Sequence, residues 1–252
     1  MTLTGLTRMI TARAEGMDGT GKPLNKDNPR IRPIYDGIYM SEAQWFAQRL
    51  KLMFVLREPY DSFTAGNQPK GGDWSIVREY FNNASGVARD PYRTVFFVAK
   101  AARAIFDPYF TISSFSDYKM SKPDAYRVLQ KIAYINLSKM PAYKNSPEPK
   151  LRENYSNWKH IVSAQISFFD PDIIVCGGTF NYIQGEAPFY GDFEFNSRYK
   201  NGEIDTYIWQ GKLVIDAKHP SSGQFSKDEY IQGIRRAYQE FCNKYRPDLR
   251  VQ

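Results

Sequence analysis

Three stretches of the chain are almost entirely apolar and lack the alternation of a half-exposed strand. They cover residues 51–56, 132–135 and 172–176. Runs of this kind are typical of strands that are buried on both faces, so we predict a strand from each. Two further apolar segments, 204–209 and 213–216, flank Gln210-Gly211, which indicates a tight turn between two more strands.

Helical patterns separate these apolar runs. Trp158, Ile161 and Ile166 recur at helical spacing, and Ser41 precedes an acidic first turn, as at the start of a helix. We expect helices over residues 41–49, 92–105, 122–130, 151–168 and 226–244. Strands that alternate with helices indicate βαβ units. The pattern therefore predicts an α/β fold of three layers, α/β/α, around a central, mostly parallel sheet of about four strands.

The first part of the chain lacks this periodicity. Residues 14–35 are rich in Gly, Pro, Asn and Lys, a composition typical of loops. We expect residues 1–37 to form an extended N-terminal arm and residues 38–252 to form a single domain. A chain of 252 residues is long enough for one large domain with a sizeable core.

Net charge and the scarcity of cysteine narrow the class of protein. Lys and Arg number 34 against 27 Asp and Glu, a formal charge of +7, and this suits a polyanionic partner such as DNA. Two cysteines and two histidines form no zinc or iron–sulfur pattern, so we expect neither metal nor cofactor. Scarce cysteine and the lack of an apolar run of roughly 20 residues predict a cytoplasmic protein in a reducing compartment.

Three polar residues stand at the ends of predicted strands, where open α/β sheets gather their ligand-binding groups. Glu58 and Asn136 each follow a buried run, and His219 follows the last predicted strand. A carboxylate can orient water or stabilise positive charge, and an amide offers one acceptor and two donors to the edge of a base. Each also has a structural interpretation, as a paired loop glutamate, a turn asparagine or a loop histidine bound to backbone.

Four segments, in order along the chain, resemble the uracil-DNA glycosylase superfamily. Arg57-Glu58-Pro59-Tyr60 resembles its water-activating loop, which typically reads Gln-Asp-Pro-Tyr, and Ala133-Tyr-Ile-Asn136 resembles the strand that ends in a base-reading asparagine. Residues 158–178 are similar to the helix, strand and Gly turn that follow, and residues 214–221 to the strand and His-Pro-Ser loop that contacts the minor groove. The resemblance spans roughly residues 38–245.

The resemblance implies an enzyme that hydrolyses the N-glycosidic bond of uracil, or of a related deaminated or mismatched base, after flipping it out of DNA. In this interpretation Glu58 positions the attacking water and His219 stabilises the departing base. Asn136 binds the base edge, and Tyr60 restricts the entry of bases with a 5-methyl group. Further candidates for contact with the base are Arg57, Phe63 and Trp74.

The same resemblance implies contacts with the DNA backbone by a monomer that needs no metal. Ser221 corresponds to a phosphate-binding serine, and Phe225 is the candidate wedge that fills the gap left by the flipped base. The other candidates for DNA contact are Ser222, Lys139 and Lys218.

The chain departs from the family pattern at several of these positions. Glu58 replaces an aspartate, Arg57 a glutamine and Asp61 a histidine. Ser222-Gly223-Gln224-Phe225 stands where the family has a proline and an intercalating leucine. One alternative is therefore a DNA-binding protein that kept the scaffold and lost the chemistry.

A second alternative rests on carboxylates elsewhere in the chain. Pro171-Asp172 followed by Asp216-Ala217-Lys218 is similar to the PD-(D/E)xK signature of magnesium-dependent nucleases. There the carboxylates bind Mg²⁺ and the lysine assists hydrolysis. A purely structural role for all the marked residues is the third alternative.

Overall fold

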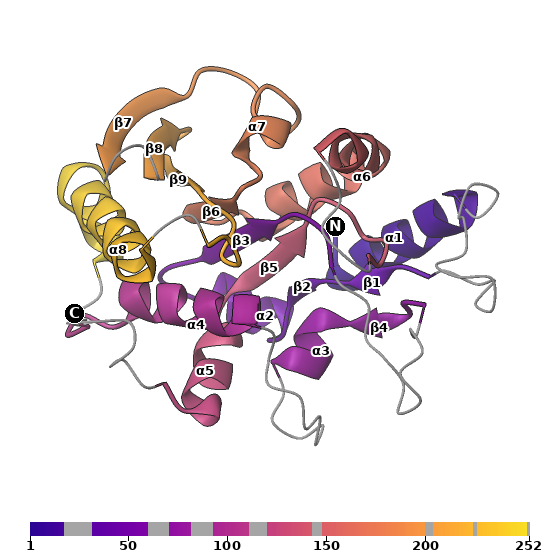
Figure 1. Cartoon of the computed structure of the whole chain (residues 1–252), viewed down its shortest axis with the longest axis horizontal. Helices are drawn as coiled ribbons and strands as arrows, with labels where there is room; N and C mark the ends of the chain where they lie inside the picture. Colours follow the sequence, from indigo (N-terminus) through magenta and orange to yellow (C-terminus); the bar gives the residue numbers. More distant parts are fainter. Residues whose placement is uncertain are drawn as a thin grey trace.

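The predicted apolar runs form the centre of a large sheet. The structure is a computed structural model, and it describes residues 1–17, 32–59, 71–81, 93–110, 120–142, 148–199, 204–223 and 226–250. In these residues seven strands pair in the order β2-β5-β3-β6-β9-β8-β7 (Figure 1). The strands are β2 (Gly37–Ile38), β3 (Leu52–Leu56), β5 (Ala133–Asn136), β6 (Ile173–Gly177), β7 (Glu194–Tyr199), β8 (Ile204–Trp209) and β9 (Lys212–Ala217).

The four central strands, β5, β3, β6 and β9, are parallel to one another. They are four of the five strands that the apolar segments predict, so an α/β fold with a parallel-rich sheet is confirmed; the fifth, β8, is antiparallel to β9. The described sheet is larger than about four strands, because antiparallel strands extend both edges. At one edge β2 has two residues, too few for a pattern, and at the other β7 is largely exposed and carries no apolar run.

Helices cover both faces of the sheet (Figure 1). Alternate residues of β3 divide between the two sides: Leu52, Phe54 and Leu56 belong to the core under α4, α5 and α8, and Met53 and Val55 to the core under α1 and α6. The helices are α1 (Leu3–Met17), α2 (Glu42–Phe46), α3 (Ile76–Tyr80), α4 (Arg93–Phe106), α5 (Lys122–Leu129), α6 (Glu148–Phe169), α7 (Phe180–Ile183), α8 (Lys227–Lys244) and the short 3₁₀ helix η2 (Pro247–Leu249). None of these described helices is long and apolar enough to cross a membrane.

The N-terminus corrects one expectation. Residues Leu3–Met17 form α1 rather than an extended arm, because Leu6, Ile10 and Ala14 recur every four residues and bury one helical face against the core that α6 shares. The expectation of an arm rested on the Gly, Pro, Asn and Lys content of residues 14–35. It did not take the four-residue spacing of these apolar residues into account. Residues 18–31 lie outside the described part of the chain. A single domain over residues 38–252 stays a prediction.

A second, two-stranded sheet lies near the edge of the first. It pairs β1 (Ile34–Tyr35) with β4 (Trp74–Ser75) in parallel, and Ile34 is the register partner of Trp74. Ser75 then caps α3 by accepting the backbone N–H of Arg78. These pairings hold Trp74 in a defined place.

Candidate active site

The carboxyl ends of the parallel strands meet at one edge of the sheet. Leu56 is the register partner of Asn136, and Cys176 is the partner of Asp216. The segments that follow β3, β5 and β9 therefore leave the sheet side by side, as the rule for ligand sites in open α/β sheets requires. Glu58, Asn136 and His219, which lie far apart in sequence, are brought together here.

These three side chains line a cavity of about 150 Å³, which we call the strand-end pocket. Its lining residues are Leu56, Glu58, Pro59, Trp74, Ile76, Tyr80, Thr94, Val95, Tyr134, Asn136 and His219. The volume is smaller than the roughly 300–1,000 Å³ of sites for drug-sized ligands, so the pocket suits a compact ligand. A few polar groups that converge in an otherwise apolar pocket form the usual pattern of a small-ligand site.

Backbone hydrogen bonds fasten the Glu58 segment to the segment after Asn136. The N–H groups of Leu137, Ser138 and Ala142 donate to the carbonyls of Leu56, Arg57 and Pro59, at 2.8, 3.1 and 2.9 Å. The pairing of β3 with β5 thus continues past the sheet edge. Glu58 is 8% exposed, so its carboxylate is held in a fixed loop and largely shielded from solvent.

The amide of Asn136 carries a buried donor at the wall of the pocket. The residue is 1% exposed, and its Nδ2 has no hydrogen-bond partner among the described residues. An unpaired donor in a buried site costs about 1–3 kcal/mol. A ligand that accepts a hydrogen bond would remove this cost, so the amide points to a polar ligand.

His219 is held in one tautomer by its own loop. Its Nδ1 lies 2.8 Å from the Ser221 hydroxyl and accepts the Ser221 backbone N–H at 3.3 Å. Since Nδ1 accepts, the ring proton of the neutral imidazole is on Nε2. Burial and, second, the nearby Arg57 cation lower the pKa of His219 to about 4. The side chain is therefore a neutral donor at physiological pH.

Two glycines allow the His219 loop to approach the end of β6. A Cβ on Gly177 would lie 2.5 Å from Leu56 Cδ2 and 3.0 Å from Pro220 Cδ. Gly178 has a φ of +68°, and its N–H donates to the Ala217 carbonyl at 2.7 Å. Any side chain at Gly177 would push the loop away, so the Gly-Gly pair sets the place of His219.

Aromatic rings form the walls of the strand-end pocket. Trp74 and Tyr80 meet edge to face with centroids 5.3 Å apart, and Tyr134 packs in the same way on Phe81 at 5.8 Å. Trp74 is a candidate from the sequence, whereas Tyr80 and Tyr134 were missed. Tyr134 could have been found, because residues two apart on a strand point to the same face and Asn136 is two positions later.

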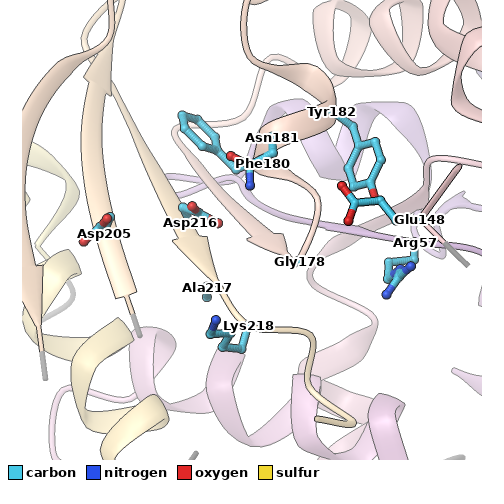
Figure 2. Close-up of a pocket in the computed structure, with 10 residues that line it drawn as sticks. All are labelled: Arg57, Glu148, Gly178, Phe180, Asn181, Tyr182, Asp205, Asp216, Ala217 and Lys218. Carbon is cyan, nitrogen blue, oxygen red and sulfur yellow. The ribbon is translucent and has the colours of Figure 1, made fainter. Parts of the chain in front are cut away.

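A second cavity, of about 430 Å³, opens at the same sheet edge. Figure 2 shows Asp205 and Asp216 on one side of it, and Glu148, Tyr182 and Arg57 on the other. Lys218 also lines it and is exposed. With three carboxylates against two cations, this cavity is not a continuous phosphate track.

Asp216 makes the stability of the protein depend on pH. Burial and, second, its cross-strand neighbour Asp205 raise the pKa of Asp216 to about 6. In the unfolded chain an aspartate titrates near 3.9. The folded state thus holds the proton more tightly, and the stability this gives is lost as the pH rises from about 4 to about 6.

Asp216→Asn should therefore raise the melting temperature near neutral pH, because the amide stays uncharged. The gain should shrink as the pH is lowered toward about 4, where the wild-type carboxyl is protonated in both states. Thermal unfolding of both proteins across this pH range checks the prediction. A difference in melting temperature that stays constant with pH would contradict it.

The structure corrects the interpretation of Lys139. The residue is 0% exposed, and its ammonium lies 2.7 Å from the carboxylate of Asp36, whose side chain is also fully buried. It cannot reach a DNA phosphate. An interpretation from net charge assumes that every lysine is exposed. Lys139 is buried because it pairs with Asp36, which lies 103 residues away in sequence.

The remaining candidates are Ser221, Ser222, Lys218 and Phe225 for contact with the DNA backbone or the gap, and Arg57, Tyr60 and Phe63 for contact with the base; they divide into two groups. Ser221 and Lys218 are exposed, and Ser222 and Arg57 are half-buried, all close to His219 or the second cavity. Tyr60, Phe63 and Phe225 lie outside the described residues, so their roles stay predictions.

The geometry does not fit the nuclease alternative. Asp172 precedes β6 and accepts the backbone N–H of Lys51 at 2.8 Å, at the opposite edge of the sheet from Asp216. Cys176 is the strand partner of Asp216, so the two aspartates are four residues apart along the strands, or roughly 13 Å. In the described residues no group of three or more His, Cys, Asp or Glu side chains could hold a metal ion.

Comparisons with known proteins add little to this geometry. No protein-family model matches the chain, and no curated protein is similar to it in sequence. Among solved structures, the wild-type UNG of Nitratifractor salsuginis is similar to 81% of this chain and 74% of its own, at 10% identity and a TM-score of 0.33. At this level the two folds share too little for the likeness to support a function.

Proposed function

We propose that the protein is a DNA N-glycosylase that removes uracil or a related deaminated or mismatched base. The observation that carries the proposal is the strand-end pocket, which Asn136 lines together with Glu58 and His219 and beside which the Asn136 amide keeps a donor without a partner among the described residues. The four sequence motifs that resemble uracil-DNA glycosylases supply these three residues in order.

The pocket suits a single base that has left the helix. Trp74, Tyr80 and Tyr134 present ring surfaces, and stacking of a base on an aromatic ring is worth about 1–3 kcal/mol. The amide of Asn136 can donate to a base carbonyl and accept from a ring N–H. Flipping costs a few kcal/mol, which these contacts would offset.

The chemistry divides between Glu58 and His219. As the bond between C1′ and the base nitrogen breaks, its electron pair stays on the base and the sugar becomes oxocarbenium-like. The Glu58 carboxylate would stabilise this cation and orient the water that attacks C1′, taking up the proton that the water loses. The Nε2–H of His219 would donate to the base oxygen on which negative charge develops.

The contacts with the DNA backbone are proposed at the rim. The Ser221 hydroxyl, the Ser222 segment and the Lys218 ammonium follow β9 directly, and the formal charge of +7 favours a polyanion. Arg57 would approach a phosphate from the other side of His219. Because Asp205, Asp216 and Glu148 also line the second cavity, the strand would pass nearer to Arg57 and Lys218 than to these carboxylates.

A base-release assay on a panel of substrates tests the proposal. Duplexes that contain uracil, hypoxanthine, xanthine or mismatched thymine are incubated with the protein, with and without EDTA. The expected result is an abasic site from at least one substrate, at a rate that the chelator does not change. Release of no base from any of them would overturn the proposal.

One observation favours a second candidate, a DNA-binding protein without catalysis. Glu58 stands where the resembled family has an aspartate, and the extra methylene displaces the carboxylate by about one bond, or roughly 1.5 Å. Tight binding of uracil-containing DNA without base release would support this candidate.

A further inference from the structure

A buried polar cluster lies directly behind Asn136. It consists of Asp36, between β1 and β2, Lys139, three residues after Asn136, and Gln165 on α6. Both charged side chains are fully buried, and Gln165 is buried as well. We call these three residues the Asp36 clamp.

The clamp holds both backbone groups of Asn136. The Asn136 N–H donates to Asp36 Oδ2 at 2.7 Å, and the Lys139 ammonium donates to the Asn136 carbonyl at 2.7 Å. The same ammonium lies 2.7 and 3.0 Å from the two Asp36 oxygens. Gln165 Nε2 donates to Asp36 Oδ1 at 2.8 Å and completes the cluster.

The clamp supplies the hydrogen bonds that a longer β2 would give to the backbone of Asn136. Strand β2 pairs with β5 only at Tyr134 and Ala133, so on that side Asn136 lies beyond the end of the ladder. A charged carboxylate takes the place of the strand carbonyl, and charge-assisted hydrogen bonds are shorter and stronger than neutral ones. With its backbone fixed on both sides, Asn136 keeps only its side-chain torsions free.

An ion pair of this kind is a costly way to fill a core. Apolar residues of similar volume often give equal or greater stability, so its presence calls for a role beyond packing. Its bonds end on the backbone of Asn136, a residue that lines the pocket. The direction of the Asn136 side-chain amide depends on where that backbone is held.

We propose that Asp36, supported by Lys139 and Gln165, is a positioning residue that aims the Asn136 amide at the base. This inference rests on the proposed function. It adds specificity-determining residues that do not touch the base themselves. Asp36 and Lys139 lie outside the four segments that resemble the glycosylases, and Gln165 lies on the helix of the third segment.

A double-mutant cycle tests whether Asp36 acts through Asn136. Single-turnover base release from the best substrate is measured for wild type, Asp36→Asn, Asn136→Ala and the double variant, below the melting temperature of each. Misplacement of a binding group by an ångström can cost about 100-fold in rate, so Asp36→Asn should slow release by up to about that factor. In the Asn136→Ala background the same change should have no further effect.

The matched control is Asp172→Asn. Asp172 also accepts a backbone N–H, that of Lys51 just before β3, at 2.8 Å, and it lies 3.6 Å from an arginine, but at the opposite edge of the sheet. It should lower stability without changing base release. If Asp36→Asn slows release by the same factor with and without the Asn136 side chain, the clamp is merely structural and the inference is overturned.

Gln165→Leu covers the case in which Asp36→Asn does not fold, because it removes one donor to Asp36 and leaves the ion pair intact. Gln165→Leu should slow base release less than Asp36→Asn does. If it slows release in the Asn136→Ala background as well, the inference fails. The ¹⁵N signal of the Asn136 side-chain amide, assigned by its loss in Asn136→Ala, needs no activity. It should shift in Gln165→Leu and not in Asp172→Asn, and an unshifted signal overturns the clamp even where no base is released.

Discussion

Replacing His219 by alanine should slow base release from a uracil-containing duplex by about 10²–10³-fold, the usual cost of losing one donor to a developing anion. The reason is the fixed tautomer: Ser221 donates to Nδ1, which leaves the proton on Nε2. Single-turnover kinetics report the loss directly. His219→Gln keeps an N–H donor and should retain more activity than His219→Ala.

The pH dependence of base release shows whether His219 acts as a neutral hydrogen-bond donor or as a general acid. Because burial and Arg57 lower the pKa of His219 to about 4, the imidazole stays neutral over the working range, and wild-type release should show no histidine limb between about pH 8 and about pH 5.5. The control is His160→Ala, which removes the chain's other histidine from an exposed position on α6. A His219→Ala variant as active as His160→Ala would contradict the assignment.

The central strands and their polar ends could be predicted from the sequence, because both follow from one physical rule. A strand buried on both faces must be apolar throughout, and parallel strands end at the same edge of the sheet. Glu58, Asn136 and His219 therefore meet once the order of strands is right. The short strands β1, β2 and β4 contain two residues each, and no periodicity can be seen over two positions.

The clamp could not be predicted, because its members carry no local signal. Asp36 lies between two such short strands, and its contacts with Lys139 and Gln165 span 103 and 129 residues of sequence. A lone lysine after a strand is usually solvated, so Lys139 was assigned to DNA. Only the three-dimensional pairing shows that Lys139, which was expected to contact DNA, holds the backbone of Asn136.

Replacing Glu58 by glutamine should lower base release by about 10²–10⁴-fold, the range for a lost general base. The amide has the same size and lacks the charge that would stabilise the sugar cation. Binding of uracil-containing DNA should not weaken, because the change removes a negative charge near the phosphates. Glu153→Gln, an exposed position on α6 paired with Lys150, makes the same substitution outside the site and should leave both measurements unchanged.

Glu58→Asp then tests the length of the side chain at constant charge. Three backbone hydrogen bonds tie its loop to the segment after Asn136, so the loop should not move inward to follow a shorter side chain. The carboxylate would withdraw by roughly 1.5 Å, and release should fall by about 100-fold, although aspartate is the residue of the resembled family. Faster release by Glu58→Asp than by wild type would show that the glutamate is misplaced and that this chain has drifted from catalysis toward DNA binding.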